Sequence, residues 1–168
     1  MAVPLALVPA SDDPLRGAAR LAAADFADEG AALHGRPAAM ARAAARLEYL
    51  AHTLTQDARY GAVPGGTVMA LGSGVREVRQ VLGIAESAVP EQLVGILTAA
   101  AQAIEAGRVP VLPAAIFPAG QERTLQRLNE PGPLPDAALA TGRLVEVIDS
   151  LDARSGWGTQ PATTPTLR

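Results

Sequence analysis

Hydrophobic residues recur with the period of an α-helix along most of this chain. The clearest pattern lies in residues 37–57, where apolar side chains at intervals of three and four residues form one continuous stripe. A weaker stripe of the same period covers residues 14–34, after an acidic cap and with Pro14 in its first turn. The short gap between the two segments predicts a long antiparallel helical hairpin over residues 14–57.

The acidic residues near Gly30 predict where the first helix ends. A helix that stopped at Gly30 would place Asp25, Asp28 and Glu29 at the negative end of its dipole, which is unfavourable. We therefore expect the helix to continue to about residue 34, with Gly35 as its terminator.

The stretch TVMALGSGVREVRQVLG, residues 67–83, has two possible interpretations. If TVMAL were a strand and VREVRQVL a helix, GSG would form a glycine turn that could hold a phosphate. The alternative is one amphipathic helix that contains two glycines. The aliphatic spacing of three and four residues continues through the glycines without a change of period, at Val68, Leu71, Val75, Val78 and Leu82.

Other features also favour the helix. Glu77 stands where a dinucleotide fingerprint needs its third glycine, and the other strand-like segments contain prolines that interior strands exclude. Gly72 and Gly74 would each cost a helix about 1 kcal/mol relative to alanine. We therefore predict that a neighbouring helix packs closely against the backbone at Gly72 and Gly74.

The rest of the chain completes an all-α domain of five or six helices. Prolines and glycines bound further helices at residues 90–107, 120–130 and 135–152. Residues 108–120 contain three prolines but are strongly apolar, which predicts an ordered crossover. We predict an apolar N-terminal arm (residues 1–13), a helical domain (14–152) and a flexible C-terminal tail (153–168). The helical domain consists of the hairpin (14–57) and a second helical unit (67–152).

Composition excludes several kinds of chemistry. The 14 basic residues of the 168 are all arginine and are outnumbered by 17 acidic ones, for a net charge of −3, which argues against nucleic-acid binding. Without cysteine there are no disulfides, thiolate nucleophiles or zinc–thiolate sites. Without lysine there is no Schiff-base chemistry and no phosphate-loop lysine.

No set of residues predicts a catalytic site, a metal site or a cofactor. Glu48 and His52 share one flank of the 37–57 helix, but a carboxylate-bridged metal site needs several such pairs, so we interpret them as a surface ion pair. The acidic residues near His34 suggest a solvated helix end rather than an acid–base pair. Ser73 does not form a nucleophile elbow, because the pattern GxSxG needs glycines at positions 71 and 75, which are Leu71 and Val75.

Four residues are candidates for a protein interface. Tyr49, Arg42 and Arg46 fall on the polar side of the 37–57 helix, and tyrosine and arginine are enriched at interfaces. Trp157, between two glycines in the predicted tail, suits an anchor that inserts into a pocket on another protein or on another copy.

These observations favour a non-enzymatic interaction or assembly protein, such as an adaptor, a chaperone-like binder or a subunit of a larger complex. Its predicted partner is another protein or further copies of itself. The alternative is a small enzyme or ligand-binding protein with a pocket between helices. No stretch is apolar enough to cross a membrane and the N-terminus lacks a positively charged signal region, so we expect a cytoplasmic protein without a membrane partner.

Overall fold

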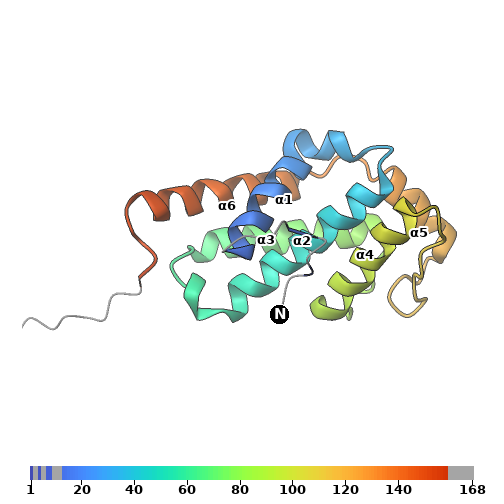
Figure 1. The fold of residues 1–168 in the computed structure, drawn as a ribbon, viewed down its shortest axis with the longest axis horizontal. Helices are drawn as coiled ribbons and strands as arrows, with labels where there is room; N and C mark the ends of the chain where they lie inside the picture. Colours follow the sequence, from blue (N-terminus) through green and yellow to red (C-terminus); the bar gives the residue numbers. More distant parts are fainter. Residues whose placement is uncertain (2–3, 5–6, 9–12, 159–168) are drawn as a thin grey trace, which may run out of the picture.

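The computed structural model describes residues 1, 4, 7–8 and 13–158, and within these residues it is all-helical, without a strand. The fold is a single helical domain that includes the long N-terminal hairpin, as the sequence predicts. Short 3-10 turns follow α1 and α2. The helices are, in chain order (Figure 1), α1 (Pro14–Gly30), α2 (Pro37–Gln56), α3 (Gly65–Leu82), α4 (Pro90–Glu105), α5 (Gln121–Asn129) and α6 (Pro135–Ala153).

Local sequence signals explain where several helices begin. Proline lies in the first turn of α1, α2, α4 and α6, where a missing N–H costs nothing. The Asp13 carboxylate caps α1 by accepting hydrogen bonds from the N–H groups of Leu15 and Arg16, at 3.0 and 3.3 Å.

The start of α6 has no cap from its own neighbouring residues and is capped by a different helix. The carboxylate of Glu77, on α3, accepts hydrogen bonds from the N–H groups of Asp136 and Ala137, each at 3.0 Å. A negative charge at a helix N-terminus is favourable, so this contact also fixes α6 against α3.

Helix α3 runs without interruption through Gly72, Ser73 and Gly74, which confirms the helical interpretation and removes the phosphate turn. The two glycines differ in their surroundings. A Cβ on Gly74 would lie 3.1 Å from Cα of Ala137, on α6, whereas a Cβ on Gly72 would have no heavy atom within 4 Å. The close backbone approach therefore occurs at Gly74, where α3 meets α6, and Gly72 has no such contact.

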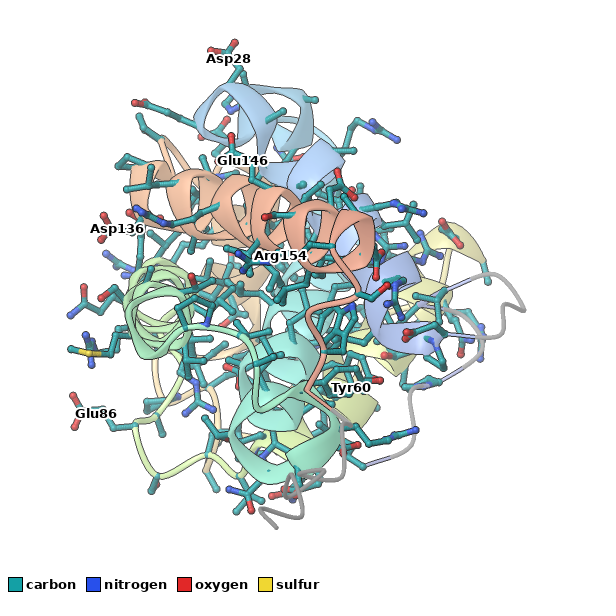
Figure 2. All side chains as sticks on the ribbon, turned by 90° about the vertical axis from the view of Figure 1, so that its left-hand side faces the viewer. Asp28, Tyr60, Glu86, Asp136, Glu146 and Arg154 are labelled. Atoms are coloured by element: carbon teal, nitrogen blue, oxygen red, sulfur yellow. The ribbon has the colours of Figure 1, made fainter. Side chains whose placement is uncertain are left out.

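The prediction that the first helix continues to about residue 34 was wrong. Regular helix stops before Ala27, whose backbone is extended, and Asp28 and Glu29 adopt left-handed conformations with φ of 52° and 54°. The N–H of Leu134 donates to the Glu29 carbonyl at 2.8 Å and stabilises this turn. The Asp28 carboxylate points away from the body of the protein (Figure 2), and the Asp25 carboxylate is paired with Arg46.

Helix α2 lies at the centre of the domain. It contacts α1, α3, α4 and α5, whereas α6 packs on α1 and α3 (Figure 1). Because α6 belongs to the second half of the chain, its contact with α1 joins the two halves. Alanines of α1 and α2 are buried, which lets these helices pack closely around the larger core residues Phe26, Met40, Leu47, Leu50, Leu93 and Phe117.

The connection between α4 and α5, residues 106–120, contains no helix or strand. Leu112, Ile116 and Phe117 are buried, as expected for an ordered crossover. Val111 is 80% exposed and Val109 is 73% exposed, however, so not all of the apolar content of this connection serves the core.

Both ends of the domain carry apolar residues that pack on it. Leu7 and Val8, from the predicted arm, belong to the hydrophobic core. After α6, the Gly156 N–H donates to the Leu151 carbonyl at 2.8 Å and Trp157 packs against the core. The remainder of the predicted tail, residues 159–168, and residues 2–3, 5–6 and 9–12 of the arm lie outside the described residues.

Candidate functional site

The predicted interface residues of α2 are largely covered by this chain itself. Tyr49 exposes only 4% of its surface, and burial raises the pKa of its phenol. Arg42 forms an ion pair with Glu105, at the end of α4. The expectation that Tyr49 lies on a polar side was wrong, because α2 is packed against several helices and has no fully solvated side. An interface role for Tyr49 or Arg42 stays a prediction.

Arg46, also on α2, links the N-terminal arm to the helical hairpin. Its Nε donates to the Leu7 carbonyl at 2.7 Å, and its Nη1 donates to Asp25, on α1, at 2.7 Å. Burial raises the pKa of the Asp25 carboxyl, although Arg46 acts in the opposite direction. Arg46 thus stabilises the arm and the pairing of α1 with α2.

Trp157 packs against its own chain. Its Nε1–H donates to Asp152 at 2.7 Å, its ring meets Tyr60 edge to face at a centroid distance of 6.1 Å, and the Arg16 guanidinium lies 5.0 Å from the ring centroid. Figure 2 shows Tyr60 beside this C-terminal segment. The hydrogen bond from Arg16, followed by that from Trp157, lowers the pKa of Asp152 to about 2. Insertion of Trp157 into another protein, as the sequence suggested, stays a prediction.

The two histidines, His34 and His52, line different hollows. His34 lines a hollow of about 610 Å³ beside the α1–α2 turn, whereas His52 lines one of about 260 Å³ at the end of α2. The interpretation of Glu48 and His52 as an ion pair with each other was wrong, since Glu48 bonds to Arg79 and His52 contacts Glu91. Among the described residues, no three His, Asp or Glu side chains gather closely enough to hold a metal ion.

The outward side of α4 differs from an ordinary solvent-facing helix surface. The helix carries charge only at Glu91 and Glu105, near its two ends. Solvent-facing helix surfaces usually bear charged side chains throughout their length. The exposed and half-buried positions between the two glutamates are instead small, apolar or amide-bearing: Gln92, Gly95, Ile96, Ala99, Gln102, Ala103 and Ile104.

This uncharged side of α4 forms one wall of a groove with a volume of about 460 Å³, which we call the α4 groove. The helix contributes Gly95, Ile96, Ala99, Gln102 and Ala103. The chain that follows α4 forms the other wall with Arg108, Val109, Val111 and Pro113. Two highly exposed valines therefore stand beside a helix surface of small residues, which gives an apolar groove open to solvent.

Charges lie at the two ends of this surface. Arg108 lines the α4 groove and forms no ion pair with any residue that the structure describes. At the opposite end of α4, one carboxylate oxygen of Glu91 lies 2.9 Å from Nε2 of His52. The side chain of Glu91 is half exposed, so it can still reach a molecule bound along the helix.

The sequence contained a signal for this groove that periodicity did not use. Residues 92–104 include no charged side chain, although every third or fourth position on one side of the helix faces solvent. No feature of the sequence predicted that Val109 and Val111 lie beside this surface of α4, because their position depends on how the chain turns after Gly107.

Comparisons with known proteins do not assign the chain to a family. No family model, no characterised protein and no solved structure matched it. In the described part of the chain, every helix is too short or too polar to cross a bilayer.

Proposed function

We propose that this protein is a non-enzymatic helical interaction or assembly protein that binds a protein partner through the α4 groove. The observation that carries the proposal is the exposed, uncharged side of α4 beside Val109 and Val111. Depletion of charge at the centre of a surface and enrichment of apolar area are features of protein interfaces. Exposed apolar grooves of this kind commonly mark sites of protein interaction.

The shape of the groove favours a helix as the element that binds. Gly95, Ala99 and Ala103 recur every four residues, so they lie close together on the helix surface and leave no large side chain above it. A partner helix can approach such a surface closely, with its apolar side chains between α4 and the two valines. The charge of the groove, a single arginine, gives little attraction for nucleic acid.

Substitution of Ala99 by glutamate tests the proposal. Ala99→Glu places a carboxylate in the middle of the groove, and we expect it to abolish partner binding. Because Ala99 is exposed, the variant should remain folded. Ala24→Glu makes the same change at an exposed position of α1 and is the matched control. Binding is measured by affinity purification with mass spectrometry and by the solution mass of the purified protein.

The proposal fails if the wild-type protein is strictly monomeric and also captures nothing above background. It also fails if Ala99→Glu binds the same partners as the wild type. A cytoplasmic location is part of the proposal and is tested by cell fractionation of the tagged protein.

A further inference from the structure

We infer that residues 155–158 form a clasp that opens and closes at the end of α6, and that the closed clasp withholds Trp157 from other molecules. The structure shows the closed state, in which the indole lies on its own chain. In the open state the indole faces solvent and the Tyr60 ring loses its aromatic neighbour. The inference goes beyond the proposed function, because no residue of the clasp lines the α4 groove.

The contacts of Trp157 join three separate parts of the chain. Tyr60 belongs to the 3-10 turn after α2, Arg16 to the first turn of α1, and Asp152 to the last turn of α6. Arg16 pairs with Asp152 and also with Asp13, the residue that caps α1. Release of Trp157 removes its hydrogen bond and its two ring contacts but leaves the Arg16–Asp152 pair in place, so the clasp can open while the helices stay packed.

Ser155 carries the backbone cost of the closed state. Helix α6 ends in a Schellman motif, in which the Gly156 N–H donates to the Leu151 carbonyl at 2.8 Å. The motif needs one left-handed residue, which is usually glycine, and here that residue is Ser155 with φ of 51°. A left-handed backbone is unfavourable for residues with a Cβ, so closing the clasp strains Ser155.

Two other helices end in the same motif without this strain. Gly83 follows α3 with φ of 68° and Gly107 follows α4 with φ of 69°. In both cases the next residue donates its N–H to the carbonyl five positions earlier, at 2.8 Å. At α6 the glycine comes one position later, where a Cβ on Gly156 would lie 3.0 Å from Cδ2 of Leu151. The strained hinge is therefore a feature of the helix that precedes Trp157.

The contacts that close the clasp are modest and are opposed by this hinge. The indole is only half-buried, and the side chains of Arg16 and Asp152 are 30% and 35% exposed, so water replaces their contacts with Trp157 when the indole leaves. Edge-to-face and cation–ring contacts are weak at such exposure. Because the cost of a left-handed serine is of similar size, the clasp opens by a local motion and not by global unfolding.

Hydrogen exchange at the Trp157 indole N–H measures this opening, since the N–H donates to Asp152 in the closed state. In the wild type we expect exchange slower than in a free indole and faster than at the buried Leu50 amide of α2. Ser155→Gly relieves the strain and should slow the exchange by about fivefold. Ser155→Val places a β-branched residue in the left-handed region and should accelerate it by at least about tenfold.

Ser87→Gly and Ser87→Val are the matched controls. Ser87 is exposed and its backbone is not left-handed, so these variants should leave the exchange of the indole N–H unchanged. Acrylamide quenching of Trp157 emission tests access by another molecule and should increase in Ser155→Val. Thermal unfolding checks that each variant is folded.

Three results would overturn the clasp. Exchange at the rate of a free indole would show that it is not closed, and exchange at the rate of the Leu50 amide would show that it opens only when the protein unfolds. Equal exchange rates in the wild type and both Ser155 variants would show that the hinge does not control it. The α4 groove is tested separately, since Ala99→Glu should leave the indole exchange unchanged whether or not it loses a partner.

Discussion

Glu48 of α2 and Arg79 of α3 are joined by two hydrogen bonds, with Oε1···Nε at 2.5 Å and Oε2···Nη2 at 2.9 Å. The side chain of Glu48 is 6% exposed and that of Arg79 is 13% exposed. Arg79 also donates to the Glu86 carbonyl at 3.3 Å. This fork therefore connects α2, α3 and the chain that follows α3 in a largely water-free position.

Removal of one partner of this ion pair should destabilise the fold. We expect Glu48→Ala to lower the free energy of unfolding by about 3 kcal/mol, because it leaves the Arg79 guanidinium largely buried without its carboxylate. The double variant Glu48→Met/Arg79→Met should lie within about 1 kcal/mol of the wild type. Urea denaturation measures both, and an unchanged midpoint for Glu48→Ala would show that the pair contributes nothing.

The two glycines of α3 should respond to alanine with opposite signs. Gly74→Ala brings a Cβ against the backbone of Ala137, and we expect it to lower the free energy of unfolding by about 1 to 3 kcal/mol. Gly72→Ala meets no neighbouring atom within 4 Å and should raise it by up to about 1 kcal/mol through helix propensity. Thermal or urea unfolding of the two variants distinguishes packing from propensity, and equal effects would contradict the close α3–α6 contact.

The cap that α3 provides to α6 should be measurable at single amides. Glu77→Ala removes the acceptor of the Asp136 and Ala137 N–H groups, and we expect it to lower the free energy of unfolding by about 1 to 2 kcal/mol. Hydrogen exchange at these two amides should accelerate more than exchange in the middle of α6. Glu146→Ala, an exposed change on α6 (Figure 2), is the control and should stay within about 0.5 kcal/mol of the wild type.

The contact between Asp152 and Trp157 should depend on pH in the acid range. The pKa of Asp152 is lowered from 3.8 to about 2, so its stabilising contribution is present above the unfolded value of 3.8 and is lost as the pH falls to about 2. Because Trp157 is the only tryptophan, its emission should shift to the red over this range as the contact weakens. Asp152→Asn should remove most of the shift, and an identical titration for this variant would contradict the assignment.

The course of α3 could be predicted from sequence because its aliphatic spacing is a local property. Val68, Leu71, Val75 and Val78 maintain one helical register on both sides of the glycines. The cost of glycine in a helix also pointed to a close contact near Gly72 and Gly74. That argument applies equally to both glycines, so it could not show that the contact is at Gly74. Only the position of α6 distinguishes them.

The end of α1 could not be predicted, because it depends on residues far away in sequence. Asp28 and Glu29 adopt left-handed backbone conformations that a local argument disfavours for glutamate. Their turn is closed by Leu134, and Gly35 donates to the Asn129 carbonyl at 2.8 Å. Arguments from helix propensity and the helix dipole use only neighbouring residues, so they could not predict these contacts.

The misplacement of Tyr49 has a different cause. A helical wheel assumes one buried side and one solvated side, and that assumption holds for a helix at the surface. Helix α2 contacts helices on several sides, so Tyr49 and Thr53 are buried along with the aliphatic stripe. The α4 groove was missed for a related reason: the absence of charge on α4 was visible, but the turn of the chain beside it was not.

The hydrogen bonds from Gly35 and Leu134 also constrain how the chain folds as it is synthesised. The first two helices leave the ribosome well before residues 129–134 are made, so their connection cannot close at that stage. The nascent hairpin must then keep its apolar surface protected, by a chaperone or by transient non-native contacts, until the second half of the chain arrives.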